Sequence, residues 1–106
     1  MSDLFSLQDK GVVITGGAGI LCGTIAEDLA AAGAKVCIAD YDEFRAHELA
    51  KSIEAKGYFA LPIRLNVLDK KEIQEAFVCA LDSMGRIDVL INGAGGNKKE
   101  ATTSEE

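Results

Sequence analysis

Apolar residues along this chain alternate between two patterns. Short runs rich in β-branched residues, bounded by glycine or charge, are typical of buried strands. Between these runs the apolar residues recur every three or four positions, which is typical of amphipathic helices. The four predicted strands cover residues 11–15, 35–39, 58–65 and 86–92.

The three segments between the strands carry start and stop signals for helices. The first has leucine or isoleucine at every fourth position and is expected to end at Gly33. Asp42 and Asp69 are expected to cap the second and third helices, because a carboxylate accepts hydrogen bonds from free amides at a helix start. Gly57 and Gly85 are expected to end them. The residues expected on the buried faces of these two helices are Ala46, Leu49, Ala50, Ile53, Ile73, Ala76, Phe77, Ala80, Leu81 and Met84.

The alternation of strand and helix predicts an α/β fold with a parallel sheet of four strands and three helices. Pro62 lacks an amide donor, so the third strand is expected at a sheet edge. Right-handed crossovers then give the strand order 3-2-1-4, with the first two helices on one face and the third alone on the other. The order reverses between strands one and four, where such sheets bind ligands.

The fourth strand would be an apolar edge, and much of one sheet face would be bare. Parallel sheets are normally covered on both faces, and an open edge can pair with another chain. We therefore expect either that a further part of the fold covers this surface or that the chain self-associates through the uncovered face or edge.

Composition narrows the range of functions. The chain has 106 residues, 48% of them hydrophobic, and a net charge of −6, which fits one domain or part of one. The acidic balance disfavours nucleic acid and anionic membrane surfaces as partners. No apolar run approaches the roughly 20 residues that a membrane span needs. With three cysteines and one histidine, neither a disulfide framework nor a metal site is expected. Because proteins without disulfides are typical of reducing compartments, we expect a cytoplasmic location.

A glycine-rich segment, residues 15–23, follows the first strand directly and opens the first helix. Glycines in such a position let the backbone approach a ligand closely, and the helix start offers free N–H groups and a positive dipole end to phosphate. A tight turn without a ligand is the alternative interpretation.

Asp40 ends the second strand, 24 residues after Gly16. A carboxylate at this point can accept hydrogen bonds from both hydroxyls of an adenosine ribose, and it would repel a 2′-phosphate. Tyr41 and Asp42 come next, so no basic residue follows directly. The pattern favours NAD over NADP, and a helix-capping aspartate is the alternative.

The chain resembles the N-terminal half of a short-chain dehydrogenase/reductase over residues 7–96. Three motifs match in order: Thr-Gly-x-x-x in the first turn, an acidic residue after strand two, and Ile-Asn-Gly-Ala-Gly after strand four. The resemblance implies a partial Rossmann fold, with residues 1–96 forming a dinucleotide-binding half-domain. Residues 97–106 are expected to form a flexible tail.

The resemblance also implies a set of cofactor-binding residues. Ile20 and Cys22 stand where the family has its second and third fingerprint glycines, and Gly93 stands where it has a second asparagine. By this resemblance, the pyrophosphate turn would be lined by Gly16, Gly19, Ile20 and Leu21. Asp40 would bind the ribose, and Asn66 and Val67 would recognise the adenine edge. Asn92 would help fix the central sheet, and the backbone of Ala94 and Gly95 would pass beside the adenosine ribose.

The family's catalytic Tyr-x-x-x-Lys pair is not found in these 106 residues. Four positions after Tyr41 and Tyr58 stand Arg45 and Pro62, so no catalytic residue is assigned and we expect the chain to be inactive alone. The resemblance implies the cofactor-binding portion of an NAD-dependent oxidoreductase, cut before its catalytic residues.

Full-length members of the family transfer hydride between a nicotinamide and an alcohol or carbonyl group of a small-molecule substrate. The segment Gly-Ile-Leu-Cys-Gly resembles a subgroup of mannonate or fructuronate oxidoreductases, which implies a sugar acid. The alternatives are a non-catalytic module that binds NAD or another adenosine nucleotide, and a product that has lost its function.

Overall fold

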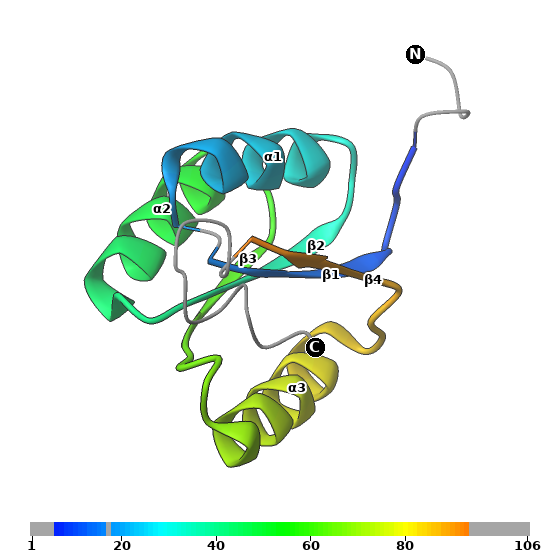
Figure 1. Ribbon diagram of the computed structural model, residues 1–106. Coiled ribbons are helices and arrows are strands. Elements are labelled where there is room, and N and C mark those ends of the chain that lie inside the picture. The colour runs from blue at the N-terminus through cyan, green and yellow to red at the C-terminus, as the bar shows by residue number, and fades with distance from the viewer. Residues whose placement is uncertain (1–5, 17, 94–106) are drawn as a thin grey trace.

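The computed structural model describes residues 6–16 and 18–93. The order of elements confirms the predicted alternation of strand and helix, and Figure 1 shows α1 and α2 on one face of the sheet with α3 on the other. The domain boundary at residue 96 and the tail predicted at residues 97–106 lie outside the described residues. The elements are β1 (Gly11–Thr15), α1 (Ile20–Ala31), β2 (Lys35–Asp40), α2 (Glu43–Ala55), β3 (Ala60–Arg64), α3 (Lys70–Met84) and β4 (Val89–Asn92).

The four strands are parallel and lie in the order β3-β2-β1-β4, which confirms the predicted partial Rossmann topology. Strand β1 pairs with β2 on one side and β4 on the other, so that Val12 lies opposite both Val36 and Val89. Pro62 of β3 is paired with Ile38 of β2. Strand β3 lies at the edge of the sheet, where no further strand on its outer side would need the amide donor that proline lacks.

Strand β1 is buried along its whole length and supplies both halves of the core. Val12 and Ile14 belong to the large cluster formed with β2, α1 and α2. Val13 points to the opposite face, where it joins Cys37 of β2 and the alanine and methionine of α3. The alternation follows from the two-residue period of a strand, and continuous burial is what a central parallel strand requires.

The caps of α2 and α3 are those the sequence predicts. The Asp42 carboxylate accepts from Arg45 N at 3.1 Å, and Asp69 Oδ1 accepts from Lys71 N at 3.0 Å and Glu72 N at 3.2 Å. Helix α3 ends at Gly85, whose φ of +86° is left-handed and favours glycine.

Three expectations need correction. Strand β3 begins at Ala60, two residues later than predicted, because Tyr58 and Phe59 follow the Gly57 turn and remain exposed. Leu81 is 48% exposed although its spacing places it on the buried side of α3, because α3 is the only helix over this sheet face within the described residues. Strand β4 begins at Val89 rather than at residue 86, because the preceding residues form a separate polar clamp.

That clamp joins the starts of β1 and β4. Asp88 Oδ2 accepts from Gly11 N at 2.8 Å, and Arg86 holds the same carboxylate through Nε at 2.8 Å and Nη2 at 2.7 Å. A Cβ on Gly11 would collide with the Arg86 carbonyl oxygen. The hydrogen bonds from Arg86, and then the amide of Gly11, lower the pKa of Asp88 below its ordinary value of 3.8.

As expected, β4 lies at an edge of the sheet, and no strand within residues 6–16 and 18–93 pairs with its outer side. Val89 is 44% exposed and Leu90 is 52% exposed, whereas the β1 side chains beside them are buried. Self-association through this edge stays a prediction. Within residues 6–16 and 18–93, no helix combines the length and the apolar character needed to cross a bilayer.

The cap of α3 gives a first test. Asp69→Ala removes an acceptor that two amides share, so we expect the free energy of unfolding to fall by about 1 kcal/mol. Urea denaturation of the chain measures it. The matched control is Asp82→Ala, which removes an exposed carboxylate from the last turns of the same helix and should cause little loss. Equal losses in both variants would contradict the capping role.

The clamp gives a pH dependence. A carboxylate with a lowered pKa in the folded state stabilises the fold above its ordinary pKa, and this contribution disappears as the pH falls through that range. We therefore expect the melting temperature to fall below about pH 4, and to fall less steeply in Asp88→Asn, whose side chain does not titrate. Thermal unfolding followed from pH 7 to pH 2.5 measures this, and identical slopes in the two proteins would disprove it.

Candidate functional site

The carboxyl end of β1 runs into a turn shaped by two glycines. Gly16 has a φ of +69°, which is a left-handed conformation, and its amide donates to Ala39 O at 2.7 Å. The Gly19 amide donates back to Gly16 O at 3.3 Å, which closes the turn just before α1. The turn therefore brings bare backbone to the end of the sheet where the strand order reverses.

Helix α1 begins without a side-chain cap, unlike α2 and α3. Its N-cap is Gly19, and its first turn contains no acidic residue. The first helical hydrogen bond runs from Gly23 N to Gly19 O at 2.7 Å, so the amides of Ile20, Leu21 and Cys22 precede it. Ile20 is 90% exposed, so its side chain does not fill the turn. Amides left at a helix start, with the positive end of the helix dipole, form a site for an anion such as phosphate.

Asp40 connects this turn to the end of β2. Its Oδ2 accepts from Ala18 N at 3.0 Å, and its Oδ1 accepts from Asp42 N at 2.9 Å. Each carboxylate oxygen keeps a further lone pair, so the group can still accept from a ligand hydroxyl. Asp42, rather than Asp40, caps α2, so the capping alternative for Asp40 does not account for its contact with the turn.

A residue that sequence analysis did not single out completes the support of the turn. Arg45 Nη2 donates to Ala18 O at 3.1 Å, so both backbone polar groups of Ala18 are held by β2 and α2 side chains. The two residues are 27 positions apart, and no local signal joins them. The turn is therefore fixed by charged groups from the neighbouring βα unit.

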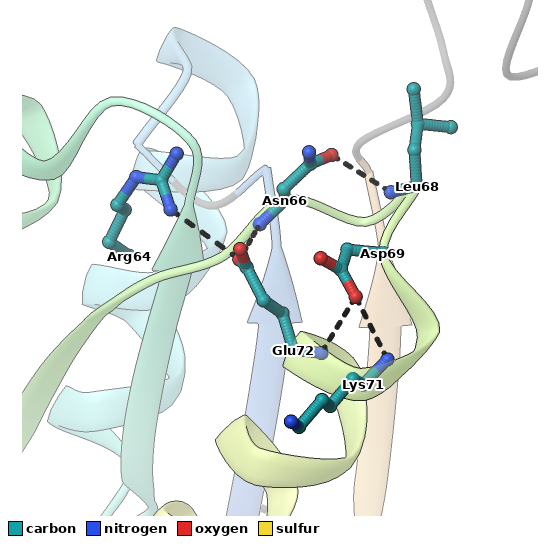
Figure 2. A network of polar contacts seen from close by, with 6 residues as sticks. All are labelled: Arg64, Asn66, Leu68, Asp69, Lys71 and Glu72. Carbon is teal, nitrogen blue, oxygen red and sulfur yellow. Dashed lines mark hydrogen bonds and ion pairs between the residues drawn. The ribbon is translucent and has the colours of Figure 1, made fainter.

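Asn66 and Val67 follow β3, and Asn66 lies in the polar network of Figure 2. Asn66 N donates to Glu72 Oε1 at 3.0 Å, and Asn66 Oδ1 accepts from Leu68 N at 3.0 Å. The Glu72 carboxylate also contacts Arg64 at 3.5 Å. Val67 packs partly buried against the small cluster that contains Ala39.

The role predicted for Asn66 needs a refinement. The resemblance implies that this side chain recognises an adenine edge. Its amide oxygen is already used within the loop by Leu68 N, whereas no hydrogen bond within the described residues is assigned to its NH2 group. The side chain can therefore offer a ligand two donors and one remaining lone pair.

Asn92 ties the end of β4 to the end of β1. Its Oδ1 accepts from Thr15 Oγ1 at 2.8 Å, and the next amide, that of Gly93, donates to Thr15 O at 2.9 Å. The hydrogen bond between the Thr15 and Asn92 side chains joins the carboxyl ends of the paired strands β1 and β4. It stabilises the sheet beside the turn. Ala94 and Gly95 lie outside the described residues.

Apart from the Cys22 thiol in the first turn of α1, no cluster of reactive side chains lies at this site within residues 6–16 and 18–93. The cysteines are free, and burial, followed by the nearby Cys79 thiol, raises the pKa of Cys37 to about 12. Within the described part of the chain, no group of three or more His, Cys, Asp or Glu side chains could hold a metal ion. The site that remains combines an uncapped helix start, a fixed glycine turn and a carboxylate.

Comparisons with known proteins identify relatives of this chain. A family model described as short chain dehydrogenase matches residues 10–106. An oxidoreductase of Bacillus subtilis with no assigned substrate, UxuB, is 40% identical over 101 residues, which is 95% of this chain and 36% of the relative. A 5-keto-D-gluconate 5-reductase of Escherichia coli is 35% identical over 103 residues, or 97% of this chain and 41% of the relative.

A solved structure is similar over the same region. It is that of a Haemophilus influenzae protein with bound NAD, provisionally called a D-mannonate oxidoreductase, with a TM-score of 0.85 and 35% identity. The similarity covers 92% of this chain and 35% of that one. The chain thus spans between about a third and two fifths of the length of these relatives.

The tie between β1 and β4 can be tested by Thr15→Val, which keeps the packing volume and removes the hydroxyl donor. We expect the free energy of unfolding to fall by about 1 kcal/mol, because Asn92 loses an intramolecular hydrogen bond. Thr24→Val is the control, since its exposed hydroxyl donates only to Ile20 O on the surface of α1 and should matter less. Urea denaturation compares them, and an unchanged Thr15→Val variant would refute the tie.

Proposed function

The chain belongs to the short-chain dehydrogenase family, and we propose that it forms the NAD-binding portion of an oxidoreductase of that family. One observation carries this proposal. The Asp40 carboxylate is hydrogen-bonded to the glycine turn through Ala18 N, directly beside the uncapped start of α1. An acceptor for ribose hydroxyls and donors for phosphate therefore lie next to each other, which is the pairing that an adenosine dinucleotide needs.

Each half of that ligand has matching groups on the chain. The amides of Ile20, Leu21 and Cys22 can donate to the pyrophosphate, with Gly16 and Gly19 leaving room for its approach. Asp40 can accept from the two ribose hydroxyls through its unused lone pairs. The adenine would lie toward Asn66 and Val67, at the loop that follows β3.

We also propose a preference for NAD over NADP. A 2′-phosphate would stand against the Asp40 carboxylate, and like charges repel. Among the described residues, Arg45 and Arg64 are the cations best placed to offset this repulsion, Arg45 at the turn and Arg64 opposite Asp40 in β3. Arg45 donates to Ala18 O, and Arg64 stacks over the Tyr41 ring at 4.8 Å and contacts Glu72. Both guanidinium groups already have contacts on the protein.

For the whole protein we propose hydride transfer between a nicotinamide and an alcohol or carbonyl carbon of a sugar acid. Two relatives carry names of this chemical class, the 5-keto-D-gluconate 5-reductase and the D-mannonate oxidoreductase. The proposal concerns a longer polypeptide, because this chain spans 36% of one relative and 41% of another.

A second candidate function is a non-catalytic module that binds NAD or another adenosine nucleotide. It is supported by the same contacts, because the Asp40 carboxylate and the uncapped start of α1 need no catalytic residue to bind an adenosine nucleotide. Both candidates use the same site. They differ in whether further residues supply proton transfer to a substrate.

We further propose a cytoplasmic location. Cys22, Cys37 and Cys79 are all free thiols in the structure. Free thiols persist where glutathione and thioredoxin keep the compartment reducing.

The ribose assignment is tested by calorimetric titration of the full chain with NAD and NADP, comparing wild type with Asp40→Asn. Asparagine keeps an acceptor for Ala18 N but loses the charge. We expect the wild type to bind NAD more tightly than NADP, and the ratio of the two Kd values to shrink roughly 10- to 100-fold in the variant, since hydrogen bonds to charged groups contribute about 1.5–3 kcal/mol.

Using the ratio separates cofactor selection from damage to the turn, because a distorted turn would weaken both ligands equally. Asp42→Asn is the matched control: it changes the same charge two residues away, and asparagine caps α2 nearly as well. That control should leave the ratio unchanged. Absence of NAD binding by the wild type would overturn the proposed function, and an unchanged ratio in Asp40→Asn would overturn the role of Asp40.

A further inference from the structure

The first residue after β4 lies against the first turn of α1. Gly93 N donates to Thr15 O at 2.9 Å, which holds this backbone close to the end of β1. A Cβ added to Gly93 would collide with Cys22 Sγ, whereas the nearest other atom, Thr15 O, would be 3.2 Å away. The thiol of Cys22 therefore occupies the space that a side chain at position 93 would need.

The conformation of Gly93 does not itself require glycine. Its φ lies outside the left-handed region, unlike that of Gly16, so an alanine could adopt the same backbone. The thiol is therefore the first obstacle to a side chain at position 93, and the Thr15 carbonyl at 3.2 Å is a second, close one. Positions 22 and 93 are also two of the places where this sequence departs from the pattern of its family, and a single contact accounts for both.

We infer that Cys22 and Gly93 form a size-matched pair that positions the start of α1 against the end of β4. Cys22 acts as a positioning residue: its own amide belongs to the helix start proposed for phosphate, and its side chain sets how closely that start approaches β4. Cys22 and Ile91 also pack on the same core cluster, so the contact continues the packing of α1 on the sheet. This inference rests on the proposed function only where it concerns cofactor binding.

The test introduces Gly93→Ala into three backgrounds: the wild type, Cys22→Ala and Cys22→Ser. In the wild type we expect the melting temperature to fall on the order of 5–10 °C, because an added methyl overpacks a close contact. Cys22→Ala removes the colliding sulfur, and its Cβ lies 3.9 Å from the added carbon, at ordinary contact distance. In this background Gly93→Ala should lower the melting temperature clearly less than in the wild type, with only the close contact to Thr15 O remaining.

Cys22→Ser is the matched control, because it keeps an atom in the position of the sulfur. Gly93→Ala should remain costly in that background. An equal cost in all three backgrounds, or no cost in the wild type, would overturn the pair. Equal costs would assign the obstacle to Thr15 O, which all of these variants retain.

A second measurement covers the case in which Gly93→Ala unfolds the chain. In a Cys79→Ser background the exposed thiol is removed, and Cys22 and the buried Cys37 remain. The added methyl should push the Cys22 thiol outward and raise its rate of modification by a thiol reagent several-fold, while Cys37 stays protected. Rapid modification of both Cys22 and Cys37 would show that Gly93→Ala unfolds the chain. In that case, if the double variant Gly93→Ala/Cys22→Ala again protects Cys37 from the reagent, the result still supports the pair. Failure of that recovery would overturn it.

NAD titration of the same proteins tests the positioning role. Gly93→Ala should weaken NAD binding about tenfold, and Cys22→Ala should restore it along with the melting temperature. Unchanged NAD affinity in a folded Gly93→Ala variant would overturn the positioning role and leave a purely structural pair. If no variant binds NAD but the melting temperatures remain coupled, the proposed function fails and the size-matched pair stands.

Discussion

Strand β1 is held at both of its ends, and the geometry of the site depends on this. At its start the Asp88 carboxylate binds the Gly11 amide, and at its end Thr15 both donates to Asn92 and accepts from Gly93. Because a buried central strand cannot shift without breaking two ladders, these contacts fix where its carboxyl end lies. The glycine turn and the start of α1 follow that end directly, so their position relative to β4 is set by the same contacts.

The three helices begin in different ways, and the difference has a physical meaning. Helices α2 and α3 satisfy their first amides with the carboxylates of Asp42 and Asp69. Helix α1 begins at Gly19, which has no side chain to offer. A helix start without a side-chain acceptor leaves amides for water or a ligand, and an anion is the partner that the helix dipole favours. The fold thus places the glycine-capped start of α1 at the point where the strand order reverses.

Much of the fold could be predicted because its determinants are local. The strand Gly11–Thr15 is a short, mostly apolar run with a charged residue before it and glycine after it. Asp69 and Gly85 mark the two ends of α3, and Pro62 indicates that β3 is an edge strand. Boundaries were wrong where long-range contacts intervene, as at the start of β4, where the Asp88 side chain accepts from Gly11 N, 77 positions away. The exposure of Leu81 depends on how many helices cover that face of the sheet. The spacing of apolar residues along a single helix carries no information about the number of neighbouring helices.

The α/β class, the strand order and the glycine turn followed by an acidic residue were predictable from the amino-acid pattern, because each follows from short-range signals and the handedness of crossovers. Packing in three dimensions was needed to see that Asp40 bonds to Ala18, that Arg45 holds the same residue, and that the Cys22 thiol lies where a side chain at position 93 would go. The residues that these three contacts join are separated along the chain by 22, 27 and 71 positions, respectively. Their distances are set by how β1, β2, β4 and α1 pack, and no local pattern encodes that packing.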